Sequence, residues 1–243
     1  MGLSDLSKQL DERKQTSTKS QPYAMGRQTV RKARTDLTSK DFEASIKLKT
    51  MPALKWLEVQ FPKVFIEEIN QYIDDVVIPN DKDYSNKLVG QVKQEIKLSS
   101  NFIKKNLLKF ISYNIKKYIK MSIKKDVKKI NLKNLWVVRQ FKNEYNPIHF
   151  HSGNISGVGY LKIPKNITKS RKRLKTNGTI DFIHGSKSFL NNSLFNHNPK
   201  VGDLILFPNY LMHTAYPFKR DGERRSFSFN IDIDKKTFDV FHG

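Results

Sequence analysis

Three histidines and one arginine in the second half of the chain are the residues best suited to chemistry. His149 and His151 lie two positions apart, and residues i and i+2 of a strand point to the same face, so both imidazoles could reach one metal ion. Alone, this spacing is more often a chance pair or a pair of core histidines. His213 follows the predicted strand 203–207 and supplies a third candidate ligand. The sequence has no cysteine, so a metal must be bound by His, Asp or Glu.

Arg224 begins a segment in which polar and apolar residues alternate. The alternation predicts a strand with Arg224, Ser226 and Ser228 on one face and with Phe227, Phe229 and Ile231 on the other. A guanidinium binds a carboxylate bidentately, and a neighbouring hydroxyl adds a third hydrogen bond. The polar face therefore predicts a buried site for a carboxylate ligand.

The elements that would position these residues follow a simple order, with helices before strands. Apolar residues recur at helical spacing in 65–76 and 102–121, and a shorter helix is expected around 88–98. After residue 134 the period changes to two, and short strands are expected at 136–141, 156–163, 178–183, 203–207 and 225–233. This order predicts an α+β fold in which helices pack on an antiparallel sandwich or barrel.

Composition divides the chain near residue 50. Residues 1–49 are polar and basic, without a sustained hydrophobic period, and predict an extended N-terminal arm that is ordered only by a partner. Residues 50–243 predict a single domain, with helical support at 62–130 and a strand core at 134–235.

Residues 136–234 resemble the catalytic double-stranded β-helix, a jelly-roll or cupin-like core, of Fe(II)/2-oxoglutarate-dependent oxygenases. The similarity is greatest to the prolyl-hydroxylase-like branch and, within it, to a group of small bacterial and phage proteins. It depends on the order and spacing of several pieces more than on any one of them. These pieces are His149-Phe150-His151, 156–161, 178–182, 199–208, His213 and 224–230.

The resemblance implies a dioxygenase that uses Fe(II), 2-oxoglutarate and O2 to hydroxylate a substrate, with peptidyl residues as the substrate class. By position, it implies that His149 and His213 are the first and last metal ligands. Arg224 with Ser226 would bind the distal carboxylate of 2-oxoglutarate, and Tyr160 could add its hydroxyl to the same carboxylate.

Strand neighbours such as Arg139 or Phe141 are expected to line the pocket. One position departs from the superfamily pattern, because the usual first motif is His-x-Asp/Glu and His151 stands where the carboxylate is expected. One interpretation is a three-histidine iron centre that still supports oxygenation, and a second is an altered metal preference such as zinc. In a third, His151 turns away and a carboxylate such as Asp181 binds the metal, and a metal-free relic is a fourth.

The distribution of charge along the sequence indicates a binding partner rather than a type of reaction. The formal net charge is +22, and nearly all of the excess lies in residues 101–200. A basic 101–175 surface, which includes the loop 165–175, favours an anionic partner such as nucleic acid or a protein. The alternative is a lysine-rich surface that is only solvated.

Two other functions are compatible with the sequence. The polar arm suggests a non-catalytic, structural module of a phage particle or assembly, in which the arm binds a partner protein. The basic block suggests a nucleic-acid-modifying oxygenase. The absence of a long apolar run, of a signal pattern and of cysteine predicts an intracellular, cytoplasmic protein without a membrane partner. The resemblance to phage proteins adds the expectation of association with a phage.

Overall fold

The computed structural model describes residues 54–80, 83, 85, 88–169 and 176–241. The chain divides into two units, Met1–Pro52 and Ala53–Gly243, and the description below concerns the second. The predicted arm, 1–49, and residues 170–175 of the predicted basic loop lie outside the described residues.

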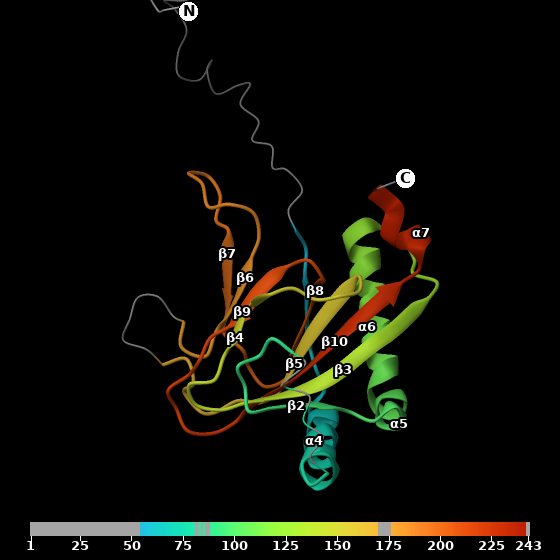
Figure 1. The fold of residues 1–243 in the computed structure, drawn as a ribbon. Coiled ribbons are helices and arrows are strands. Elements are labelled where there is room, and N and C mark those ends of the chain that lie inside the picture. Colours follow the sequence, from blue (N-terminus) through green and yellow to red (C-terminus); the bar gives the residue numbers. More distant parts are fainter. Residues whose placement is uncertain (1–53, 81–82, 84, 86–87, 170–175, 242–243) are drawn as a thin grey trace, which may run out of the picture. The chain divides into compact units, whose positions relative to one another are not determined.

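Two antiparallel sheets form the core of the described part of the chain (Figure 1). The larger sheet contains, in spatial order, β1 (Leu57–Gln60), β8 (Asp203–Pro208), β5 (Ile155–Lys162), β10 (Arg224–Ile233), β3 (Ile130–Gln140) and β2 (Gln94–Lys97). The smaller sheet contains β4 (Asn146–His149), β9 (Met212–Ala215), β6 (Ile180–Ile183) and β7 (Leu194–His197). The chain passes back and forth between the two sheets, so strands distant in sequence become neighbours. This is a double-stranded β-helix, as predicted.

Helices pack on one face of the larger sheet. Their bounds are α4 (Lys63–Tyr72), η1 (Ile73–Val77), α5 (Ser100–Phe102), η3 (Ile103–Leu107), α6 (Leu108–Ile123), α7 (Lys235–Phe238) and η4 (Asp239–Phe241). The apolar stripes of α4 and α6 form one buried cluster with Phe227, Phe229 and Ile231 of β10. The predicted helices at 65–76 and 102–121 are therefore confirmed. Among the described residues, no helix is both long and apolar enough to cross a membrane.

The helix predicted around 88–98 is wrong, because this segment contains the edge strand β2. Glu95 pairs with Val138 and Ile96 pairs with Val137 of β3. The ladder to β3 satisfies the backbone groups of β2, and such tertiary context overrides local propensity. The predicted helical support, 62–130, thus includes a strand that borders the interior of the fold.

Two glycines of β5 explain part of the sequence pattern at 156–161. A Cβ atom at Gly157 would lie 2.3 Å from Cζ of Phe229, and one at Gly159 would lie 2.4 Å from Cζ of Phe227. The phenylalanine rings of β10 occupy the space that these two side chains would fill. The glycines therefore permit close packing of two central strands, which is a structural role.

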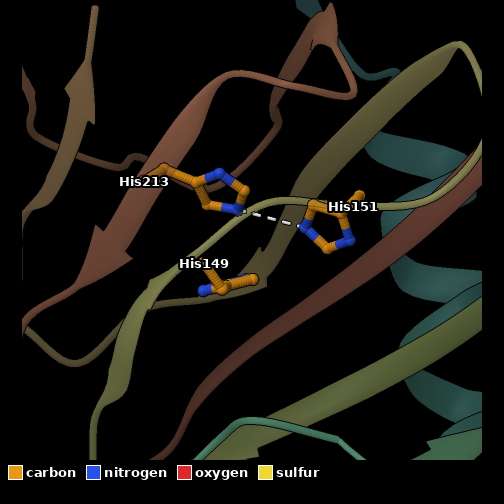
Figure 2. A group of neighbouring side chains, drawn as sticks. All are labelled: His149, His151 and His213. Atoms are coloured by element: carbon orange, nitrogen blue, oxygen red, sulfur yellow. Dashed lines mark hydrogen bonds between the residues drawn. The ribbon is translucent and has the colours of Figure 1, made fainter.

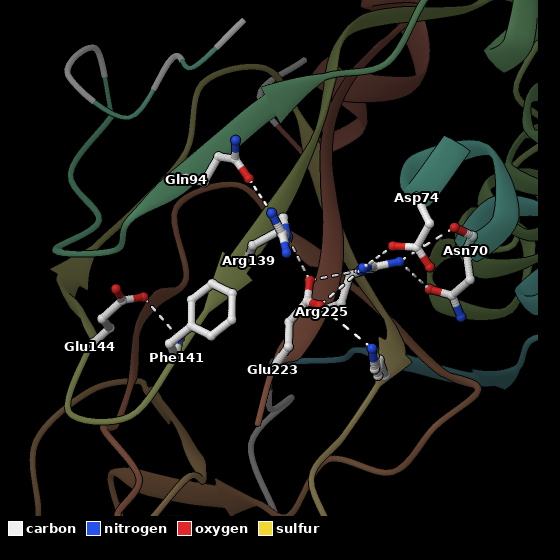
Figure 3. A network of polar contacts seen from close by, with 9 residues as sticks. Asn70, Asp74, Gln94, Arg139, Phe141, Glu144, Glu223 and Arg225 are labelled. Atoms are coloured by element: carbon white, nitrogen blue, oxygen red, sulfur yellow. Dashed lines mark hydrogen bonds and ion pairs between the residues drawn. The ribbon is translucent and has the colours of Figure 1, made fainter. Parts of the chain in front are cut away.

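A buried ion network joins the start of β10 to the helical layer (Figure 3). Arg225 donates from Nε and Nη2 to the two carboxylate oxygens of Glu223, at 2.8 and 3.0 Å, and from Nη2 to Asp74 at 2.6 Å. Arg139 Nε donates to the same Glu223 carboxylate at 2.8 Å. Glu223 and Arg225 are the residues directly before and after Arg224 in the sequence. Because successive strand residues face opposite sides, the network holds these two residues in place and leaves the Arg224 side chain on the other face.

We expect Arg225→Ala to lower the free energy of unfolding by about 3–5 kcal/mol, because it leaves Glu223 buried without its main partner. Burial alone would raise the pKa of Glu223, but hydrogen bonds and charges from Arg225 and Arg139 outweigh burial and hold it below its usual value. The stabilisation is therefore complete above the unfolded-state pKa of about 4.3 and is lost as pH falls through the lower folded-state pKa. Urea denaturation of both proteins at pH 7 and at about pH 3 measures this.

The loss caused by Arg225→Ala should be smaller at the acidic pH. The matched control is Arg220→Ala, which removes an exposed arginine a few residues away. Equal losses for the two variants at pH 7 would show that the network contributes no net stability.

Candidate active site

A cavity of ≈ 260 Å³ is lined by residues of both sheets. Its floor is formed by alternate residues of two neighbouring strands, β3 and β10. These are Asn134, Trp136, Val138 and Gln140 of β3 and Arg224, Ser226, Ser228 and Asn230 of β10. Gln140 lies opposite Arg224 and Asn134 lies opposite Asn230, so the two rows run side by side. Period-two alternation thus turns two sequence segments into one polar surface.

Three histidine side chains meet at this cavity (Figure 2). His149 of β4 lies opposite His213 of β9. His151 follows β4, and its backbone is held by Asn209: its N–H donates to Asn209 O at 3.0 Å, and its carbonyl accepts from Asn209 Nδ2 at 3.1 Å. One ring nitrogen from each histidine lies within 4.8 Å of those of the other two. The structure therefore brings together all three predicted ligands.

Hydrogen bonds determine which ring nitrogen two of the histidines present. His149 Nδ1 lies 2.7 Å from Pro147 O, and His213 Nδ1 lies 2.9 Å from Leu211 O. Because a carbonyl only accepts, Nδ1 carries the proton in each neutral ring and Nε2 carries the lone pair. His151 Nε2 is 3.1 Å from His213 Nε2. Two nitrogens that bind one ion at about 2.1 Å lie about 3.0–3.4 Å apart, so this pair has the spacing of adjacent ligands.

Burial keeps the three imidazoles neutral at physiological pH. Desolvation lowers the pKa of His149, lowers that of His151 to about 4 and lowers that of His213 to about 3, and the positive charges of neighbouring histidines add to the last two shifts. The ring of Phe207 packs 5.0 Å from that of His213, and Trp136 packs 5.7 Å from His151. Neutral imidazoles with free lone pairs are the form that binds a divalent metal.

No carboxylate joins the three histidines within the described part of the chain. Asp181 lies between Ile180 and Phe182, which line the cavity, so its side chain points to the opposite face of β6. There its oxygens accept hydrogen bonds from Asn196 Nδ2 at 2.7 Å and from the Tyr216 hydroxyl at 2.8 Å. The interpretation in which Asp181 replaces His151 as a ligand is contradicted by this placement.

Arg224 is buried in the floor of the cavity, with 3% of its surface exposed. It donates hydrogen bonds to Gly178 O at 3.0 Å and to Gln140 Oε1. The ion pairs of the described residues do not include it. Burial lowers the pKa of Arg224 to about 10, which reflects the cost of holding this charge away from water.

Ser226 and Tyr160, the other residues predicted to bind a carboxylate, line the same cavity as Arg224. They are register partners on β10 and β5, so their side chains share a face. Burial raises the pKa of the Tyr160 hydroxyl, against the effect of the Arg224 charge. Tyr160 is therefore a neutral hydrogen-bond donor beside a buried cation, an arrangement suited to an anionic ligand.

The predicted lining role of Arg139 and Phe141 is wrong by one residue. Gln140 lines the cavity, whereas Arg139 belongs to the ion network on the other face and its guanidinium lies 5.3 Å from the centre of the Phe141 ring. Counting by twos from Trp136 would have identified Gln140. Glu95 was also missed as a lining residue, because its segment was predicted to be helical.

Comparisons with known proteins agree with this architecture. Residues 134–230 match a family model described as a putative 2OG-Fe(II) oxygenase. No protein in a curated set of sequences matches this chain.

Solved structures share the fold at low sequence identity. A prolyl-4-hydroxylase from Pseudomonas putida superposes with a TM-score of 0.50 and 11% identity, covering 73% of this chain and 92% of that one. The non-heme alpha-ketoglutarate-dependent epimerase SnoN from nogalamycin biosynthesis gives a TM-score of 0.51 and 11% identity, covering 74% and 79%. HygX from Streptomyces hygroscopicus, solved with nickel and 2-oxoglutarate bound, gives a TM-score of 0.47 and 14% identity, covering 74% and 82%.

The family match covers the strands that carry the three histidines, the glycine-containing strand β5 and Arg224. The shared fold and this match agree with each other, and the residues present fit a divalent metal and a dicarboxylate. Residues 134–230 therefore resemble the 2OG-Fe(II) oxygenase family, and the described part of the chain shares its fold with a solved prolyl-4-hydroxylase and a solved alpha-ketoglutarate-dependent epimerase.

Proposed function

We propose that this protein is a dioxygenase that hydroxylates a C–H bond of a substrate bound in the cavity. One observation carries the proposal: three neutral histidines and a buried arginine, which has no acidic partner among the described residues, line the same ≈ 260 Å³ cavity. Imidazole nitrogens suit Fe(II), and a guanidinium suits a carboxylate, so the residues fit both the metal and 2-oxoglutarate.

Each group of residues has a defined task in this proposal. His149, His151 and His213 hold Fe(II), and Arg224 with Ser226 and Tyr160 binds the C5 carboxylate of 2-oxoglutarate. The bound metal supplies the oxidative chemistry in which 2-oxoglutarate and O2 are converted to succinate and CO2 while the substrate gains one oxygen atom. The carbonyls of Pro147 and Leu211 hold the Nδ1 protons of two ligands and so keep their Nε2 lone pairs directed at the metal.

Apolar residues complete the cavity and restrict water. Phe182 and Phe207 lie against the His213 ring, with ring centres 5.8 and 5.0 Å away, and Ile180 lines the same wall. An apolar wall of this kind lowers the local dielectric constant, which strengthens the attraction between Arg224 and a carboxylate bound in the same cavity.

A metal and turnover assay tests the proposal. Purified protein is loaded anaerobically with Fe(II) or Zn(II), its bound metal is measured by mass spectrometry, and succinate is measured after 2-oxoglutarate and O2 are added. We expect one equivalent of iron and iron-dependent succinate formation. Zinc binding with no iron-dependent turnover would support the altered metal preference, and absence of both would support a structural module.

The substrate class is a further part of the proposal. The resemblance favours a peptidyl residue, and lysines of the exposed face of α6 favour an acidic partner surface. Nucleic acid remains the alternative partner for the basic 101–175 surface. Binding to duplex and single-stranded DNA and RNA at two salt concentrations separates the two, since phosphate contacts weaken steeply with salt.

A further inference from the structure

Three buried oxygen atoms around the cavity have no hydrogen-bond partner within the described part of the chain. They are Glu95 Oε2, Asn134 Oδ1 and Asn146 Oδ1, and the Trp136 indole lies beside Glu95. All four side chains line the cavity that contains the histidines. Buried polar atoms are satisfied in the great majority of cases, so several unsatisfied atoms in one cavity wall indicate a ligand.

Glu95 has the most unusual environment of the four. Its side chain is on the cavity face of β2, because its register partner Val138 also lines the cavity. The residue is only 2% exposed, and the ion pairs formed by described residues do not include it. Burial raises the pKa of Glu95 to about 7, although a hydrogen bond with the Trp136 indole acts against this rise, and the charge of Asp83 adds to it. A buried carboxylate without a cation is costly, so Glu95 is partly protonated near neutral pH, and a bound cation would stabilise its charged form.

Gly90 packs closely against Glu95 and Asn146. A Cβ atom at Gly90 would lie 2.8 Å from Asn146 Oδ1 and 3.3 Å from Glu95 Oε1, so both oxygens approach one point over this glycine. The neighbouring residues Leu88 and Val89 also line the cavity. Two backbone hydrogen bonds between Gln91 and Tyr145, at 2.8 and 3.3 Å, hold this segment in place.

The balance of donors and acceptors defines the ligand group. All three unsatisfied atoms are oxygens that accept hydrogen bonds, and the neighbouring donor, the Trp136 indole, bonds to Glu95. An ammonium offers three hydrogen-bond donors and a guanidinium offers five. Both groups are positively charged, so either one could form an ion pair with Glu95. The Trp136 ring adds an aromatic surface of the kind that attracts cations.

We propose that Glu95, Asn146 and Trp136 form a subsite for a cationic nitrogen group, an ammonium or guanidinium, of the substrate. This inference depends on the proposed function, since it assigns the subsite to the molecule that is oxidised. The Trp136 ring lies 5.7 Å from the His151 ring, so a carbon atom a few bonds from the charged nitrogen would lie beside the three histidines.

Nuclear magnetic resonance of the full-length, metal-free protein tests the subsite without turnover. The chain has two tryptophans, so two indole N–H signals are expected, and Trp136→Phe identifies one of them. The probes are butylguanidinium and butylammonium, and butylurea is an uncharged mimic of the first. We expect a saturable shift of the Trp136 signal with at least one cation and binding of butylurea that is at least about tenfold weaker.

Variants test whether the Glu95 carboxylate binds the cation. Glu95→Gln should weaken cation binding at least about tenfold, since it keeps the shape of the side chain and removes its charge. Glu68→Gln is the matched control, because it makes the same change on the exposed surface of α4. Gly90→Ala is a second test that retains Glu95, and its methyl group should also weaken binding because it would displace Asn146 Oδ1, which would lie only 2.8 Å from it. Unchanged cation affinity in Glu95→Gln, or equal affinity for butylurea, would overturn the proposal.

The outcomes separate this inference from the proposed function. Succinate formation from 2-oxoglutarate without cation binding would overturn the subsite alone, whereas cation binding without iron-dependent turnover would overturn the oxygenase function. A blocked tripeptide, acetyl-Gly-Arg-Gly-amide, distinguishes the sources of the cation. Tighter binding of the peptide than of butylguanidinium supports a peptidyl substrate, and equal or weaker binding supports a small molecule.

Discussion

His213→Ala is expected to abolish stoichiometric iron binding and to reduce succinate formation by at least about 100-fold. His213 is the most buried of the three histidines, and its Nε2 is the nitrogen closest to that of His151, at 3.1 Å. Loss of residues that merely orient metal ligands costs about 10- to 100-fold, so loss of a ligand should cost at least as much. Bound iron after dialysis and the initial rate of succinate release provide the two measurements.

His184→Ala is the control, because His184 is exposed and lies outside the cavity lining. The role of His151 needs its own pair of variants. His151→Ala should lose iron, whereas His151→Asp should retain it, since a carboxylate then occupies the position that is usual in the superfamily. Full iron binding and turnover in His151→Ala would contradict the three-histidine centre, even if His213→Ala behaves as expected.

Arg224→Ala is expected to raise the KM for 2-oxoglutarate by roughly 30- to 1000-fold and to leave the bound iron unchanged. The range corresponds to about 2–4 kcal/mol for removal of one partner of a buried, hydrogen-bonded charge pair. Arg224 is 3% exposed and has no acidic partner among the described residues, so a ligand carboxylate would be its main counter-ion. Succinate formation as a function of 2-oxoglutarate concentration gives the KM, and metal analysis gives the iron content.

Arg220→Ala is the matched control, since it removes an exposed arginine from the segment that leads into β10. Arg224→Lys should recover part of the affinity, because lysine restores the charge without the bidentate geometry. An unchanged KM in Arg224→Ala would show that 2-oxoglutarate binds elsewhere, and loss of iron in the same variant would show that the arginine supports the fold of the metal site.

Local patterns were sufficient to predict much of this fold. The helical stripes at 65–76 and 102–121 and the strands around 156–163, 203–207 and 225–233 follow from side-chain periodicity, and the structure contains all of them. The segment 88–98 could not be assigned in this way. β2 is an edge strand only four residues long, and its pairing with β3 stabilises it more than its own sequence does.

The sequence by itself determined the candidate chemistry. The histidine types and their spacing, the alternation after Arg224 and the order of the motifs are properties of the chain, and they led to the three histidines and to the predicted carboxylate site. The convergence of His149, His151 and His213 within 4.8 Å depends on pairing between strands that are distant in sequence. Local side-chain periodicity does not predict which residues such pairing brings together.

Only the tertiary structure decided which polar residues face the interior. It turned Asp181 away from the histidines and placed Gln140 rather than Arg139 in the cavity. It also buried Glu95 in the cavity wall, on a strand that the sequence did not reveal, without an ion pair among the described residues. The physical reason is that a shift of one residue moves a strand side chain to the opposite face, and the register is set by the packing of both sheets and the helices.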